Sequence, residues 1–524
     1  MNDLKKTFLA GFFVLAILLL TPYYLQLIGY QDSVSENIIK SDVGAEPASS
    51  LVEDIETVSQ KIESSSKFPK KDTPIPFEKI LKLESPLYRA SISTVGGGSF
   101  QEYLLVQDGT NKYLGGYTDE GLYQDSVHVS LILNQAEACA PCVGVVYNGV
   151  AEILRVPFKA LKNDFEFNTP IQINENDSLS LQTEYREARF SVEKSTTFFA
   201  NNFSTKHRVV VDDFQGGLEQ IYLVWDKGLR NTEKNLYDDV QTYSAAYISH
   251  NKEIEDLWFA PSSINDQTNP VSFSGNIDWA AIRTKYFIAA FVPSSANSAL
   301  IDGQPYMLNE SAVVPSYSVS VFTSKKVLES MLYVGPLDVD YVGELNTSLD
   351  RIMNFGWFII QPFSRGVLWL LKALHSFGLN YGVILVLFAF LIRIITGPLM
   401  KKSFESSQNM QTVQPKLKKL QEKYKNDSQR LNQEMVKLYK EEGVNPLGGC
   451  LPMLLQMPLL FSLFLVFRST IEFRGAPFFG WISNLAQPDT VFYLPFHIPI
   501  YGDQVAFLPI LLGISIILFF FGSL

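Results

Sequence analysis

Long apolar runs lie towards the two ends of the chain, and short alternating runs occupy its middle. The first long run extends from Thr7 to Ile28 and follows Lys5 and Lys6. A cleaved signal peptide shares the charged start and the apolar core, but bulky residues stand here in place of a small-x-small cleavage site. The pattern therefore predicts an uncleaved signal anchor over residues 1–30, with a cytoplasmic N-terminus and an exported continuation.

Three further apolar runs are long enough to cross a bilayer as helices, at about 1.5 Å per residue. They cover residues 381–400, 446–467 and 505–524. The loop over residues 401–445 carries ten Lys and Arg residues, whereas residues 468–504 carry two. The positive-inside rule places the first loop in the cytoplasm and the second in the periplasm, which agrees with the orientation predicted from the anchor.

The middle of the chain has the pattern of an exported β domain behind a tether. Residues 31–76 are rich in Ser, Glu, Asp, Lys and Pro and predict a flexible linker. Over residues 77–345, short alternating runs such as Val127–Leu133 and Phe190–Phe199 are separated by Gly, Asn, Asp and Pro. Many short strands with turn signals predict an all-β sandwich, and no run in this block has the pattern of a long amphipathic helix.

The stretch over residues 355–377 is apolar but is interrupted by polar and charged residues. Trp357 and Trp369 lie among its apolar positions. This composition predicts an amphipathic helix in the plane of the membrane interface. A further membrane span is the alternative, and the polar interruptions disfavour it.

Apolar residues recur with heptad spacing on both sides of a polar break at residues 426–428. They are Met410, Val413, Leu417, Leu420, Tyr424, Leu431, Met435 and Leu438. The spacing predicts a cytoplasmic hairpin over residues 401–445, closed by coiled-coil packing. A solvated basic spacer explains the charge but not the heptads. The positive surface of the hairpin suits anionic lipid or a cytosolic partner.

Composition and charge divide along the same boundaries. The 524 residues are 47% hydrophobic and 19% charged, which is too polar for a chain wholly within a bilayer and too apolar for a disordered one. The net charge of -11 combines +1 on residues 1–30, -18 on residues 31–345 and +6 on residues 346–524. This acidity argues against a dedicated nucleic-acid binder.

Cys139 and Cys142 form a C-x-x-C motif inside the predicted β domain. That spacing occurs in redox-active pairs, but the motif here lies in a Pro- and Gly-containing loop without a βαβ context. A local structural disulfide or an incidental pair is the favoured interpretation. A zinc site would need a second ligand pair, and none is evident among the 5 histidines, so we predict neither a metal nor a cofactor.

Arg393 lies inside the predicted span over residues 381–400, about 10 Å along the helix from Met400. An arginine at that depth either faces a wet protein cavity or extends its long side chain to the inner interface. Gln456, in the next predicted span, favours the cavity because a second polar group can line the same wet surface. An ordinary interhelical hydrogen bond is the alternative for Gln456.

Several motifs resemble those of the bacterial YidC membrane protein insertases. They are NPLGGCLPMLLQMPLLFSLF from Asn445, QEMVKLY from Gln433, the pair Gln414-Pro415, and Arg393 ahead of Gly397-Pro398-Leu399. The anchor, the β domain with its Gly96-Gly97-Gly98 turn, the interfacial helix and the cytoplasmic hairpin follow in the same order. The resemblance covers nearly the whole chain.

The resemblance implies a non-enzymatic insertase and membrane chaperone of the bacterial inner membrane, with an exported β-supersandwich similar in fold to sugar mutarotases. Arg393 matches the arginine of a hydrophilic groove in the inner leaflet. Expected partners are nascent inner-membrane proteins, the Sec translocon, a ribosome or targeting factor at the cytoplasmic loop, and membrane lipids; no cofactor or specific nucleic acid is expected. The family pattern continues with two more helices after the span over residues 505–524. A membrane-anchored periplasmic carbohydrate-binding or carbohydrate-active protein is the alternative hypothesis.

Overall fold

The computed structural model describes residues 78–106, 111–133, 138–161, 165–258, 270–309, 312–425, 427–444, 451–498 and 502–522. The predicted anchor over residues 1–30 and the predicted linker over residues 31–76 lie outside these residues. The motif residues Asn445 to Cys450 lie outside them as well.

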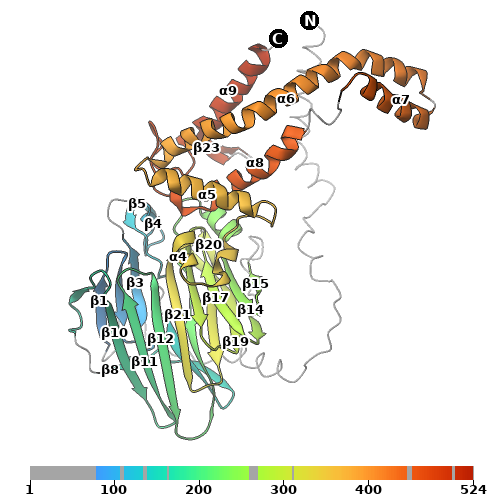
Figure 1. Ribbon diagram of the computed structural model, residues 1–524. Coiled ribbons are helices and arrows are strands. Elements are labelled where there is room, and N and C mark those ends of the chain that lie inside the picture. The colour runs from blue at the N-terminus through green and yellow to red at the C-terminus, as the bar shows by residue number, and fades with distance from the viewer. Residues whose placement is uncertain are drawn as a thin grey trace. The chain divides into compact units, whose positions relative to one another are not determined.

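A nine-stranded antiparallel sheet forms one layer of the β domain (Figure 1). Its strands, in spatial order, are β15 (Glu253–Leu257), β14 (Ala245–His250), β17 (Ile277–Arg283), β18 (Phe287–Pro293), β21 (Val327–Pro336), β12 (Ser204–Asp213), β11 (Phe190–Phe199), β10 (Ser178–Arg186) and β8 (Lys159–Ala160). Burial alternates along β11 and β12, as expected for strands with one face on the core.

A six-stranded sheet packs against the nine-stranded one. Its order is β16 (Val271–Ser274), β19 (Ser298–Asn309), β20 (Ala312–Thr323), β13 (Leu218–Trp225), β6 (Cys142–Tyr147) and β7 (Val150–Ile153). Strands β17 and β14 contact β20, and β13 contacts β21, so the two inner faces meet. Fully buried aromatic side chains, including Trp225, Trp279 and Phe198, fill the space between the layers.

Three smaller sheets complete the strand inventory of the described residues. A four-stranded sheet has the order β3 (Ser99–Leu105), β2 (Tyr88–Ser93), β1 (Ile80–Glu84) and β9 (Pro170–Gln172). The two-stranded sheets are β4 (Leu114–Tyr117) with β5 (Tyr123–His128), and β22 (Thr490–Ile498) with β23 (Gly502–Ala506). Only β1 with β9 is a parallel pair among the described pairings.

The helical module follows the β domain in the chain (Figure 1). Its helices are α5 (Gln361–His375), α6 (Tyr381–Lys423), α7 (Ser428–Glu441), α8 (Leu451–Ser469) and α9 (Phe507–Gly522). Short helical turns are α3 (Leu236–Asp238), η3 (Asp239–Tyr243), α4 (Val339–Gly343), η5 (Ser348–Ile352) and η6 (Ile471–Phe473). Together, the β-rich domain and the helical module confirm the predicted fold class.

Helix α6 runs without interruption from the predicted span into the predicted hairpin. The Asn380 side chain caps its start by accepting from the Gly382 amide at 2.7 Å. The helix continues past Pro398 and Pro415, and α7 begins after Asp427, whose carboxylate accepts from the Arg430 amide at 3.0 Å. The span and the first arm of the hairpin are therefore one continuous helix, with no break near residue 400.

Two expectations from the sequence differ from the structure. Val127–Leu133 is not one strand: β5 ends at His128, after which Ser130 and Ile132 form only isolated bridges. The reason is that successive amides of this segment bond to different partners, from Val129 to Tyr113 and from Leu131 to Tyr103.

The segment over residues 468–504, expected to be a plain loop, carries η6, β22 and the start of β23. The last helix starts at Phe507, two residues after the predicted Val505, which belongs to β23. One carboxylate oxygen of Asp489 accepts from the amides of Phe507 and Leu508 at 3.0 and 2.7 Å. This cap fixes the first turn of the helix at that position.

Candidate functional site

Arg393 is exposed on α6 among apolar neighbours that are also exposed. The exposed fractions of Phe390 and Ile394 are 63% and 70%. Within the described part of the chain, Arg393 forms no hydrogen bond and no ion pair. The helix thus presents a charged group on a surface of otherwise apolar side chains, about 18 Å from its first residue.

Gln456 is exposed near the start of α8, with exposed apolar residues such as Leu460 next to it. Helices α6 and α8 contact each other, and α5 packs against both. No hydrogen bond joins Gln456 to Arg393 among the described contacts. The structure therefore places the two predicted residues on contacting helices but does not pair them.

Helices α6, α8 and α9 expose apolar side chains that the other described residues do not cover. By length and composition, one described helical segment, Tyr381–Pro398, could cross a membrane, and it is mostly exposed. Gln456–Ser469 and Phe507–Leu518 are shorter apolar segments. Along α9, the exposed apolar side chains include Leu512 and Leu518. Exposed apolar surface of this extent marks contact with lipid or with another protein.

The eight hairpin residues with heptad spacing lie on the less exposed faces of α6 and α7. Val413 is buried, and the other seven are partly buried. The two helices contact each other, and the Lys416 ammonium lies 2.5 Å from a Glu442 carboxylate oxygen across them. The coiled-coil packing itself stays a prediction.

Lys372 on α5 connects the helical module to the β domain. Its ammonium donates to Asp338 and Asp340, which lie at the start of α4, at 2.8 Å each. It also lies 3.2 Å from Glu472 on η6. Glu472 is buried and accepts from Lys112 at 3.1 Å and from the Tyr381 hydroxyl at 2.7 Å. One buried carboxylate thus joins α5, α6 and a loop of the β domain.

The charges in this cluster depend on one another. Burial opposes ionisation of Glu472, but the ammonium groups of Lys112 and Lys372 lower its pKa to about 2. Burial tends to lower the pKa of Lys372, yet the carboxylates of Asp338 and Glu472 raise it above its ordinary value. Burial, together with the Glu472 charge, raises the pKa of Asp338. Glu472 and Lys372 are therefore both ionised at neutral pH.

Arg474 connects the segment after α8 to the β domain, and it is only 2% exposed. Its Nε donates to Glu233 at 2.8 Å. Its two terminal nitrogens donate to four backbone carbonyls, those of Lys112, Leu114, Gly115 and Thr232, at 2.6 to 3.2 Å. In the sequence, Arg474 is one of two positive charges in the predicted loop over residues 468–504, and nothing near it signals burial.

A second, more exposed ion pair lies at the end of α8. Arg468 donates to Asp238 at 2.5 Å, and Lys285 donates to the other oxygen of the same carboxylate at 2.9 Å. The guanidinium of Arg468 also lies over the ring of Tyr243, 5.7 Å from its centroid. The end of α8 and the segment after it are therefore held to the β domain by charged contacts of Arg468, Glu472 and Arg474.

Cys139 and Cys142 form a disulfide in the structure, and both residues are buried. The Gly96 turn packs directly against it: a Cβ at Gly96 would lie 2.1 Å from the Cys142 sulfur. Lys194, fully buried, donates to the carbonyls of Gly96, Gly98 and Pro141 at 3.4, 3.4 and 3.1 Å. Burial lowers the pKa of Lys194 to about 7.

One group of described side chains has spacing that could suit a cation. His250, Glu253 and Glu255 each place a potential ligand atom within 4.8 Å of the others on the β14–β15 hairpin. Both glutamates are exposed, as is common for acidic side chains that bind no ion. This group is not among the sites predicted from the sequence.

Two family matches cover most of the helical module and most of the β domain. Residues 373–521 match the family described as 60Kd inner membrane protein. Residues 152–370 match the YidC periplasmic domain. Over these two stretches the chain is similar to YidC proteins. One match lies mainly on the helical module and the other mainly on the β domain.

Relatives of the chain carry the name membrane protein insertase YidC. The protein from Chlorobium limicola is 38% identical over 326 residues, which cover 61% of this chain and 55% of that protein. The one from Prosthecochloris aestuarii is 37% identical over 336 residues, which cover 62% and 56%. The matched part of the chain thus spans a little over half the length of each of these YidC proteins.

Solved structures also align with about half of the chain. A putative aldose 1-epimerase from Escherichia coli K12 is 10% identical, with a TM-score of 0.26, over 49% of this chain and 99% of its own. A galactose mutarotase related enzyme from Lactobacillus acidophilus is 9% identical, with a TM-score of 0.30, over 49% and 97%. Scores this low carry no argument about function.

Proposed function

We propose that this chain acts as a membrane protein insertase and membrane chaperone of the bacterial inner membrane, with nascent inner-membrane proteins as its substrates. The observation that carries the proposal is Arg393, an exposed charge with no ion-pair partner among the described residues, on an apolar helix of a chain similar to YidC proteins. The names of the relatives support the same function.

The proposed mechanism needs no covalent step. Moving an unpaired polar group into hydrocarbon costs several kcal/mol, so the polar part of a substrate faces a barrier that grows with the apolar thickness it must cross. Arg393 offers a positive charge inside that thickness and Gln456 a neutral hydrogen-bonding group. A hydrophilic groove around them in the inner leaflet would hydrate and attract the substrate part-way, which shortens the path through hydrocarbon.

The topology is part of the proposal. The positive-inside rule places the α6–α7 hairpin in the cytoplasm, and the β domain and the segment between α8 and α9 in the periplasm. We assign the basic hairpin to contacts with a ribosome, a targeting factor or anionic lipid, and we expect the Sec translocon as a partner for larger substrates. The carbohydrate alternative has no comparable support, since the relatives are named insertases.

Photocrosslinking tests the proposal. We expect a photoreactive residue at Ile394 or at Gln456 to capture a nascent single-span inner-membrane protein in native membranes. Trp369 on α5 is a matched control, because its side chain is 70% exposed, as is that of Ile394. Equal capture at Trp369, or no capture at Ile394 and Gln456, would contradict the proposal.

A further inference from the structure

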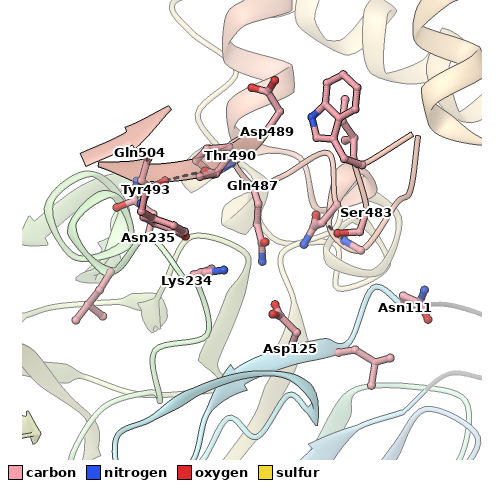
Figure 2. A pocket seen from close by; sticks show the side chains of 17 residues that line it. Asn111, Asp125, Lys234, Asn235, Ser483, Gln487, Asp489, Thr490, Tyr493 and Gln504 are labelled. Carbon is pink, nitrogen blue, oxygen red and sulfur yellow. Dashed lines mark hydrogen bonds between the residues drawn. The ribbon is translucent and has the colours of Figure 1, made fainter. Parts of the chain in front are cut away.

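A cavity of about 640 Å³ lies between the β domain and the segment that connects α8 to α9 (Figure 2). This volume is within the range of about 300–1,000 Å³ typical of ligand pockets. The β domain contributes Asp125 and Lys234 to its lining, and the connecting segment contributes Gly475, Ser483, Gln487 and Asp489.

Polar, mostly uncharged groups dominate the lining. Amide side chains come from both walls and hydroxyl side chains from the connecting segment, and Figure 2 shows them distributed around the space. The charged members are Asp125 and Asp489 against Lys234. Lys234 and Asp125 are exposed and form no ion pair within the described part of the chain, and the Ser483 hydroxyl forms no hydrogen bond there. The Asp125 carboxylate bonds to the Tyr123 hydroxyl, so the Lys234 ammonium and the Ser483 hydroxyl supply free hydrogen-bonding groups, and the cavity has a slight excess of negative charge.

The walls of the cavity are fixed by hydrogen bonds. The Asn484 side-chain oxygen accepts from the amides of Gly475 and Ala486 at 3.0 Å each. The Gln487 amide donates to the Tyr123 hydroxyl of β5 at 3.1 Å, across the two walls. A cavity held open in this way loses little conformational entropy when it binds a ligand.

The cavity lies at the ends of two apolar helices. Asp489 lines it and also caps the first turn of α9. Gly475 lines it a few residues after α8 ends at Ser469. A ligand that carries an apolar helix along α8 or α9 would therefore hold its attached polar segment close to this cavity, and such tethering raises the effective concentration of that segment.

We propose that this cavity binds the polar exported segment next to the transmembrane span of a substrate, an inference that rests on the proposed function. An extended polypeptide offers a donor and an acceptor at every residue, which the amide and hydroxyl lining can meet without regard to sequence. Indifference to sequence suits a site that receives many substrates. An anionic lipid headgroup fits less well, because the cavity carries two carboxylates and one ammonium group.

The test places a photoreactive residue at Ser483 in the protein as it stands in its native membrane. The probe is a single-span inner-membrane protein made in two versions. One has a polar exported tail of about 20 residues, which can reach roughly 60 Å, and the other a tail of about 3 residues, which reaches roughly 10 Å. Phe479 is the control, because it is exposed in the same segment but does not line the cavity. With the long tail, we expect about fivefold more tail crosslinking at Ser483 than at Phe479, and with the short tail no difference.

A second variant tests the effect of filling the cavity. Ser483→Trp removes no described hydrogen bond, and we expect it to slow insertion of the long-tailed substrate about threefold and to leave the short-tailed one unchanged, unlike Phe479→Trp. Crosslinks from Ser483 to lipid or glycan, or to nothing, while Ile394 still captures the substrate, would overturn this inference alone. Loss of capture at Ile394 as well would overturn the proposed function.

Discussion

Replacing Arg474 by methionine should release the segment after α8 from the β domain. Methionine keeps part of the apolar length of the side chain but removes all five donated hydrogen bonds. Glu233, with its side chain 8% exposed, is left as a buried charge without its partner, and four backbone carbonyls lose a donor. Breaking one side of a buried pair typically costs about 3–5 kcal/mol.

Hydrogen exchange of the β4–β5 hairpin measures this loss directly, because Arg474 bonds to the carbonyls of Leu114 and Gly115. A cost of about 3–5 kcal/mol in local opening predicts roughly 10²- to 5 × 10³-fold faster exchange of its amides. Arg468→Met is the matched control: its pair with Asp238 is partly exposed, and exposed pairs contribute only about 0–1 kcal/mol. Thermal melting of the whole protein reports whether the fold survives.

A double-mutant cycle with Glu233→Gln separates the cost of the unpaired Glu233 carboxylate from the cost of the lost hydrogen bonds. If the unpaired carboxylate causes much of the cost, Arg474→Met in the Glu233→Gln background should cost clearly less than it does alone. Two results would refute the reasoning. One is equal exchange in Arg474→Met and Arg468→Met, and the other is strict additivity between Arg474 and Glu233.

Three further predictions concern other sites. Burial lowers the pKa of Lys194 to about 7 in the folded protein. Between that pH and the ordinary lysine pKa, the unfolded state therefore binds more protons than the folded state, and the melting temperature should rise with pH. Lys194→Met should flatten this rise. Gly96→Ala should destabilise the fold by more than about 1 kcal/mol in denaturant titrations, because its Cβ would meet the Cys142 sulfur, whereas Gly149→Ala shares the positive φ but meets open space. In an insertion assay, Arg393→Leu should slow a substrate with a charged tail about tenfold and Arg393→Lys much less, and equal effects would argue against a role for the positive charge.

Patterns that depend on neighbours in the sequence were predictable. The alternating run Phe190–Phe199 has the same limits as β11, because a strand with one buried face must alternate. Asp427 caps α7 at the polar break between the heptad runs, and Tyr381 begins α6 where the apolar run begins. Val127–Leu133 shows the limit of this reasoning: alternation reports which side chains are buried but not which strand accepts each amide.

The sequence by itself determined which segments are apolar enough for a membrane, which alternate as strands, and where the charge lies, because hydropathy and periodicity are local properties. Tertiary structure alone decided that Arg474 is buried against Glu233, 241 residues away, while Arg468 stays partly exposed. It also decided that Asp489 caps α9 and lines a cavity. The burial and partners of a charge depend on what the rest of the chain packs around it, and two arginines six residues apart in the sequence look alike until that packing exists.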